Sequence, residues 1–155
     1  MPRIKSQLAA VAVIIVVGMG ARVQAASPCA LLTADDVTAV LGMPVKGLET
    51  GVSYECMYAS ESPGFQGEHP TVTLTVHGGR ADFDQSVSMG RQYGMPYTPL
   101  SGVGDKAYEN NNCGEQCAEV GVMKGKAYFT VMVQEDLNHS RSAVALARKV
   151  SERIK

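Results

Sequence analysis

Residues 71–77 read TVTLTVH, and this short stretch decides the fold class. Its apolar residues alternate with threonine, which is the two-residue period of a strand that turns one face toward a core. Strands of all-parallel sheets are buried on both faces and are apolar at nearly every position instead. The stretch therefore predicts a strand in an antiparallel or mixed sheet with one face toward solvent.

Other segments share this strand-like pattern: SYECMYAS (53–60), KAYE (106–109), AEVGVM (118–123) and AYFTVMV (127–133). Lys124-Gly125-Lys126 predicts a tight hairpin between the last two. Proline and glycine are frequent in residues 61–70 and 95–105. We expect the first of these segments to be a turn-rich connection and the second an extended loop.

Three segments predict helices, and the first has a signal at both ends. Within PCALLTADDVTAVLG (28–42), Thr33 is a predicted N-cap with Asp36 three residues later, and Gly42 ends the helix. Residues 81–94 and 138–155 give the second and third helices. The element order predicts an α+β domain, α-βββ-α-βββ-α, whose antiparallel or mixed sheet of about five to six strands carries its helices on one face.

The N-terminal segment predicts a signal peptide. Arg3 and Lys5 precede an uncharged, mostly apolar run over residues 8–20, and Val23-Gln24-Ala25 places small or acceptable residues at the two positions that a signal peptidase reads. This pattern predicts cleavage after Ala25 and a single mature domain over residues 26–155. We therefore expect a secreted or periplasmic protein.

Two membrane-bound alternatives fit the N-terminus less well. A spanning helix needs about 20 apolar residues, and Arg22 interrupts the run too early. Lipid attachment at Cys29 would require a small residue before it, where Pro28 stands. The mature chain keeps eleven Lys and Arg against fifteen Asp and Glu, a formal net charge of −4. We expect no stable membrane insertion and, without a basic stripe, no nucleic-acid partner.

All four cysteines follow the predicted cleavage site: Cys29, Cys56, Cys113 and Cys117. An even number in an exported chain predicts two disulfides. A local Cys113–Cys117 bridge with a long Cys29–Cys56 bridge is favoured, because Gly114 lets the chain turn back, although crossed pairings stay open. A redox couple or a zinc site is disfavoured, since C-x-x-x-C in a loop matches neither the C-x-x-C spacing nor two close pairs.

The order of the short motifs resembles a family of small exported bacterial proteins and lipoproteins of unknown function. The resemblance rests on CALLT (29–33), Asp36-Val37, Leu41-Gly42, Cys56-x-Tyr58 and GVGDKAY (102–108), and it covers nearly all of the mature chain. It implies an exported α+β domain with a disulfide near Cys29 and Cys56. It implies no activity, and Cys113 and Cys117 are additions to the family pattern.

No catalytic motif is evident, so we predict a non-catalytic domain without a cofactor that binds an envelope protein, a glycan or a small ligand. Candidate binding aromatics are Phe65, Tyr93 and Tyr97, near the 60–70 and 94–105 loops. The alternative is a periplasmic copper-binding or redox protein, because imidazole and thioether groups bind copper. The residues behind that alternative lie close in sequence: His69, His77, Met89 and Met95.

Overall fold

The computed structural model describes residues 27–64, 67–95 and 97–155. The predicted signal peptide, residues 1–25, and the candidate Phe65 lie outside the described residues. The elements are α1 (Pro28–Leu31), α2 (Ala34–Leu41), β1 (Val45–Leu48), β2 (Glu55–Ser60), β3 (Thr71–Val76), α3 (Arg80–Gln92), β4 (Tyr97–Leu100), β5 (Lys106–Asn110), β6 (Cys117–Lys124), β7 (Ala127–Gln134) and α4 (His139–Arg153).

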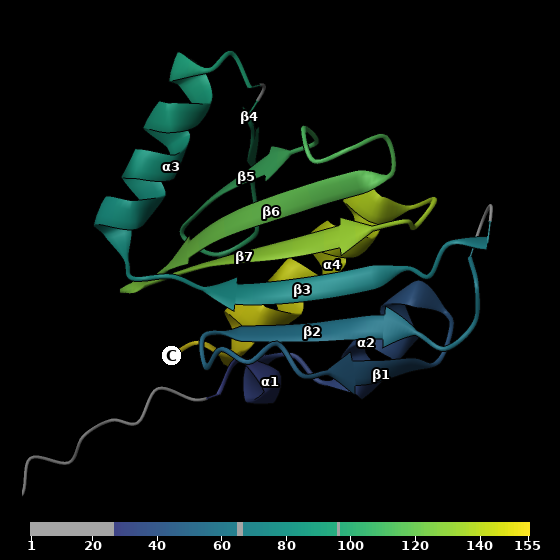
Figure 1. The fold of residues 1–155 in the computed structure, drawn as a ribbon. Helices are drawn as coiled ribbons and strands as arrows, with labels where there is room; N and C mark the ends of the chain where they lie inside the picture. Colours follow the sequence, from purple (N-terminus) through teal and green to yellow (C-terminus); the bar gives the residue numbers. More distant parts are fainter. Residues whose placement is uncertain (1–26, 65–66, 96) are drawn as a thin grey trace, which may run out of the picture.

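All strands join one antiparallel sheet of seven, in the order β1-β2-β3-β7-β6-β5-β4 (Figure 1). The α+β class is confirmed, but the predicted count of five to six strands is wrong. The missed strands, β1 and β4, have four residues each and form the two edges. Gly47 and Pro99 interrupt their apolar pattern, and an edge strand tolerates proline because one side of it needs no hydrogen bonds.

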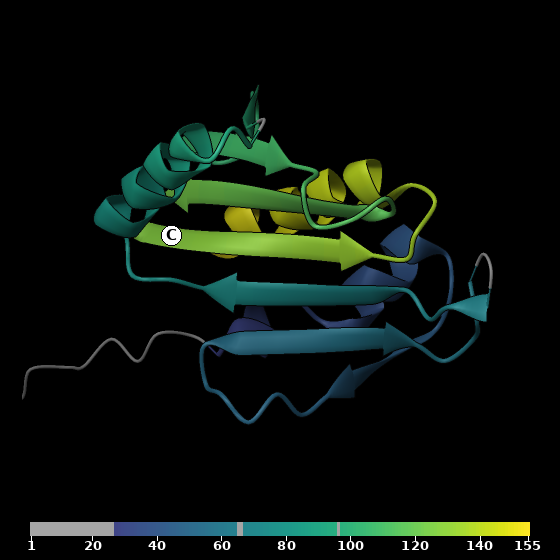
Figure 2. The same cartoon turned by 45° about the horizontal axis from the view of Figure 1, so that its top comes forward.

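Helices cover both faces of the sheet, which corrects the expectation of helices on one face (Figure 2). Phe129 of β7 belongs to the main core with α1, α2 and α4, whereas the next residue, Tyr128, packs with Phe83 of α3. Successive strand residues point to opposite faces, so α3 lies opposite the other helices. The amphipathic stripe of α3 was visible in the sequence, but a stripe does not say which face of a sheet it covers.

The main core lies between the sheet and the three helices α1, α2 and α4. Val72 and Leu74 of β3 are fully buried there, as the alternation in residues 71–77 predicts. The face of β3 that carries the threonines is less exposed to solvent than expected. Thr73 is only 5% exposed, because Met57 and Met132 flank it on the neighbouring strands.

The start of α2 forms the predicted capping box. The Thr33 hydroxyl accepts a hydrogen bond from the Asp36 amide (3.3 Å), and the Asp36 carboxylate accepts one from the Thr33 amide (3.0 Å). The same carboxylate accepts two bonds from Arg153 near the end of α4, at 2.5 and 3.0 Å. Arg153 thus joins α4 to α2.

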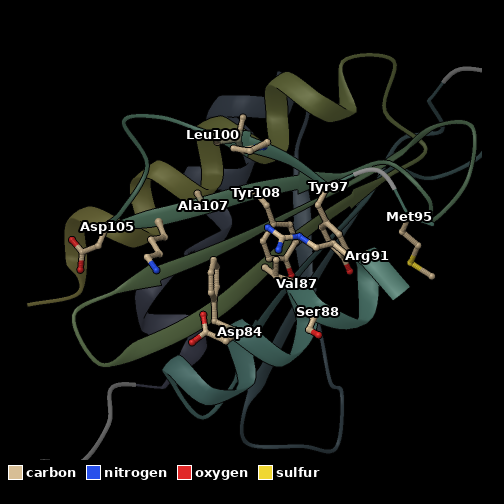
Figure 3. Close-up of a pocket in the computed structure, with 13 residues that line it drawn as sticks. Asp84, Val87, Ser88, Arg91, Met95, Tyr97, Leu100, Asp105, Ala107 and Tyr108 are labelled. Atoms are coloured by element: carbon tan, nitrogen blue, oxygen red, sulfur yellow. The ribbon is translucent and has the colours of Figure 1, made fainter. Parts of the chain in front are cut away.

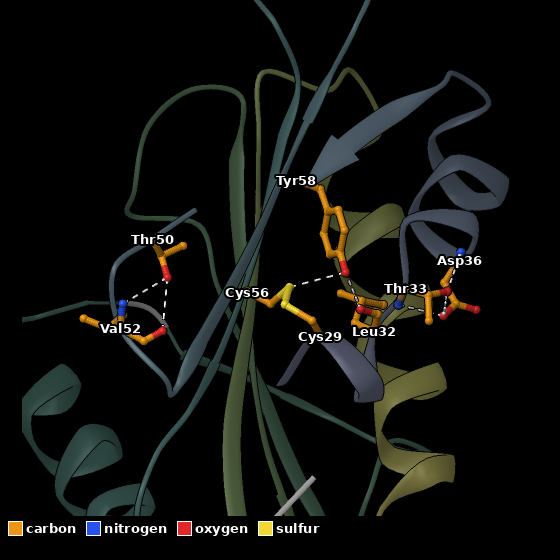
Figure 4. The surroundings of a disulfide bond; sticks show 8 residues. All are labelled: Cys29, Leu32, Thr33, Asp36, Thr50, Val52, Cys56 and Tyr58. Carbon is orange, nitrogen blue, oxygen red and sulfur yellow. Dashed lines mark hydrogen bonds between the residues drawn. A yellow bond between two sulfur atoms is a disulfide. The ribbon is translucent and has the colours of Figure 1, made fainter. Parts of the chain in front are cut away.

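Two disulfides are present, Cys29–Cys56 and Cys113–Cys117, which is the pairing that the spacing favours. The first ties α1 to β2, with 5.3 Å between the Cα atoms (Figure 4). Beside it, the Tyr58 hydroxyl donates to the Leu32 carbonyl at 2.6 Å. The second closes a short loop at the start of β6. Disulfides of this kind are typical of proteins that fold outside the reducing cytoplasm.

Candidate ligand-binding site

Helix α3 rests on the sheet above Tyr97 and leaves a hollow on each flank. Gly90 makes this close approach possible, because a Cβ at that position would overlap the Tyr97 ring. Glycine inside a helix costs about 1 kcal/mol relative to alanine. At Gly90 this loss of helix stability accompanies the close packing of α3 against the Tyr97 ring.

The smaller hollow, which we call the α3 cavity, lies on the flank that faces β6, β7 and the end of β3. Its volume is about 270 Å³. Its deepest residues are Tyr108, Tyr128 and Thr130, which are all at least 90% buried. Exposed apolar side chains line it from α3 and the residues just after it: Met89, Tyr93 and Met95. The cavity therefore opens through an apolar rim onto a polar floor.

A chain of hydroxyl groups crosses the floor. The Tyr128 hydroxyl donates to the Ser86 hydroxyl (3.1 Å), so the Tyr108 hydroxyl is the donor in its own 2.7 Å bond to Tyr128. Gly121 lets the Tyr108 ring lie across β6, since a Cβ there would overlap it. Burial raises the pKa of both tyrosines. Both hydroxyls are therefore protonated at neutral pH.

His77 forms one wall of the cavity. Its ring stacks on Tyr128 with 4.6 Å between centroids, and Nε2 lies 3.1 Å from the Thr130 hydroxyl oxygen. Burial lowers the His77 pKa, although Asp82 opposes the shift, so the imidazole is neutral at pH 7. A hydroxyl beside an imidazole is also the start of a catalytic triad. However, none of the hydrogen bonds in the described part of the chain orients the other ring nitrogen, Nδ1.

Glu119 of β6 is the acidic group of the cavity. It lies between Asn110 of β5 and Met132 of β7 in the sheet register. Burial raises the pKa of its carboxyl. No ion pair or hydrogen bond among residues 27–64, 67–95 and 97–155 involves that carboxyl. Glu119 therefore brings an uncompensated acid to the cavity floor.

The larger hollow lies on the other flank of α3, against β4 and β5, and measures about 870 Å³. The Arg91 side chain points into it (Figure 3). Lys106, Asp84 and Asp105 also line it, and all four charged residues are exposed. Water solvates such charges, and their signs balance. This groove therefore gives less reason for a particular ligand than the α3 cavity does.

The structure brings two of the three predicted binding aromatics together. Tyr93, 66% exposed, and the half-buried Tyr97 both line the α3 cavity. Their role in binding stays a prediction. Residues 61–70 connect β2 to β3, whereas β4 lies beyond β7, β6 and β5. Among the described residues of the two expected contact loops, those that line the cavity are Met95 and Tyr97, which lie before and in β4.

Sequence reasoning missed the residues of the cavity floor. Tyr108, Glu119 and Tyr128 each alternate with a buried core residue, so the two-residue period assigns them to the solvent face. The signal that could have identified them is their type. Large aromatic side chains on the open faces of neighbouring strands would expose much apolar surface, which predicts that another element covers them.

The four predicted copper ligands do not all lie together in the structure. His77, Met89 and Met95 line the α3 cavity. His69 lies elsewhere, with Nδ1 2.9 Å from the Ser60 carbonyl oxygen. Across the described residues, no group of three or more His, Cys, Asp or Glu side chains could hold a metal ion. A metal ion in the cavity would therefore need the thioether sulfurs of Met89 and Met95 as ligands.

Comparisons with known proteins identify no relative: no family, no curated protein and no solved structure matches this chain. Among the described helices, none has the length and apolar character needed to cross a membrane. The geometry of the α3 cavity and the residues that form it are therefore the basis for inferring function.

Proposed function

We propose that this protein is an exported, disulfide-stapled binding domain without catalytic activity, and that the α3 cavity is its ligand site. One observation carries the proposal. The Glu119 carboxyl lines a cavity walled by tyrosines, and nothing else in the described chain compensates it. Glu119 is half-buried, and a polar group that is partly removed from water without a partner costs free energy. Such a group in a cavity is typical of a binding site.

The shape of the site supports a small ligand. The cavity walls come from α3 and from several strands, so rigid elements hold them before a ligand arrives. The buried tyrosines are fixed by hydrogen bonds and by ring contacts, such as the 4.6 Å edge contact between Tyr97 and Tyr108. Proteins and glycans of the bacterial envelope would contact the rim first. The floor residues Tyr108, Tyr128 and Thr130 are buried beneath this rim, which favours a small molecule or the end of a larger one.

Binding is tested by an NMR screen of the oxidised protein against small amines, carboxylates, sugars and amino acids. We expect at least one compound to shift the amide signals of residues 119–121 and 128–130 together. The matched control is the surface around Val52 and Tyr54, which is exposed and lies outside the cavity. A screen in which no compound shifts the cavity signals contradicts the proposal.

Export is tested separately, by mass spectrometry of protein expressed from the full chain in a bacterial host. The leader and the two disulfides support a mature protein that starts at Ala26 and contains no thiol open to alkylation. A chain that keeps Met1 and four alkylated cysteines would show that the protein stays in a reducing compartment.

Copper(I) binding is the second candidate, because His77, Met89 and Met95 line one cavity. Imidazole and thioether ligands suit this ion. The test is a competition titration with a copper(I) chelator. Met89→Leu with Met95→Leu should abolish binding, while Met57→Leu on the same sheet face, outside the cavity, should not. Equal binding by the two variants would reject the site.

A further inference from the structure

Among the described residues, no cation pairs with the Glu119 carboxyl on the floor of the α3 cavity. Lys106, the lysine of β5 on this face, pairs with Met123. That position lies four residues along β6 from Glu119, which is about 13 Å at the rise of a strand. His77 is neutral at pH 7, as described above, and cannot balance the charge. Among the described residues, none therefore supplies a positive charge beside Glu119, and a bound cation would supply one.

The other cavity walls also favour a positive charge. Aromatic faces attract cations, and the attraction grows where water is excluded. Tyr97, Tyr108 and Tyr128 line the cavity. Of these three rings the half-buried Tyr97 is the most accessible, because Tyr108 and Tyr128 are at least 95% buried and the His77 ring stacks on Tyr128. An anionic ligand would be repelled by the Glu119 carboxylate and by the electron-rich faces of the rings. A neutral ligand without hydrogen-bond donors would cover Glu119 without compensating it, which adds to the cost of its burial.

We infer that the α3 cavity binds an organic cation of the alkylammonium class, with its charged nitrogen beside Glu119 and its carbon groups against the tyrosine rings. This inference rests on the proposed function and names the ligand class for the same cavity. The volume of about 270 Å³ lies just below the roughly 300 to 1,000 Å³ of sites for drug-sized ligands. The cavity therefore suits a small cation or the cationic end of a longer molecule.

The decisive comparison uses choline and 3,3-dimethyl-1-butanol, in which carbon replaces the charged nitrogen. Both are titrated into the oxidised protein and followed by NMR. Choline should bind at least about tenfold more tightly, because the two molecules share a shape and differ in charge. Choline should shift the amide signals of residues 119–121 and 128–130. Rising salt should weaken it by screening the charge pair.

Matched variants assign the effect to named side chains. Glu119→Gln keeps the shape and removes the charge, and should weaken choline binding about tenfold or more. Its control, Glu55→Gln, changes a carboxylate of β2 on the same sheet face outside the cavity and should leave binding unchanged. Tyr97→Leu should weaken binding, whereas Tyr54→Leu should not. Circular dichroism and the melting temperature show whether each variant is folded.

Each outcome decides between the two proposals. Equal binding of the neutral analogue, or unchanged binding by a folded Glu119→Gln variant, overturns the cation inference. If sugars or carboxylates shift the cavity signals and amines do not, the cation inference fails while the proposed binding function stands. If no compound of any class shifts them, both fail.

Discussion

Asp36 connects local and long-range structure through a single carboxylate. Its bonds to Thr33 close the first turn of α2, and its bonds to Arg153 reach across 117 positions of sequence to the end of α4. The Asp36 side chain is 10% exposed and that of Arg153 40% exposed. The hydrogen bond from Arg153 holds the Asp36 pKa far below its usual range, against the opposing effect of burial.

We expect Asp36→Asn to lower the free energy of unfolding by about 1 to 2 kcal/mol at pH 7, because it removes a charge-assisted pair that water partly screens. The folded-state pKa lies below the unfolded value of about 3.9. The stabilisation is therefore fully present above the unfolded value and is lost as the pH falls through the folded one.

Urea unfolding at pH 7 and pH 2.5 checks this prediction. The difference between the original protein and Asp36→Asn should shrink at the lower pH. Asp35→Asn is the control, because Asp35 occupies the same helical turn but is exposed. A difference that does not change between the two pH values would contradict a role for the ionised carboxylate.

At the scale of elements, the sequence predicts what local patterns encode. The capping residues of α2, the alternation of β3 and the Lys124-Gly125-Lys126 hairpin all appear as expected. The edge strands were missed because Gly47 and Pro99 interrupt the alternation within their four residues. The face covered by α3 depends on its contacts with distant strands, so no local pattern encodes it. The α3 cavity follows from that placement and was therefore beyond prediction as well.

The close contact between α3 and Tyr97 provides a test in which helix propensity and packing predict opposite effects on stability. Gly90→Ala should stabilise an isolated helix by about 1 kcal/mol. In the folded protein the added methyl group overlaps the Tyr97 ring. We expect a net loss of at least about 1 kcal/mol, because overpacking commonly costs about 1 to 3 kcal/mol.

Ser88→Ala is the matched control, since Ser88 is exposed on the same helix and alanine again raises helix propensity. It should be neutral or slightly stabilising in thermal unfolding. Adding Tyr97→Ala to Gly90→Ala should restore part of the loss, because the clash is then removed. A stabilising Gly90→Ala would mean that α3 does not rest on Tyr97.

For the whole molecule, the two disulfides differ in how much of the chain they constrain. Cys29 and Cys56 are separated by 27 positions and join the first helix to a central part of the fold. Cys113 and Cys117 are separated by 4 positions. The sequence could predict both bridges from the even cysteine count and spacing. Their energetic difference follows from the length of the loop that each one closes.

We therefore expect the long bridge to contribute more to stability. The chain-entropy relation gives roughly 3 to 4 kcal/mol for the long loop and about 2 kcal/mol for the short one. Replacing Cys29 and Cys56 by alanine should lower the guanidinium unfolding midpoint more than replacing Cys113 and Cys117. The short-loop variant is the matched control, because it also removes two sulfurs. Equal midpoints, or a larger loss from the short loop, would show that neither bridge acts mainly by restricting the unfolded chain.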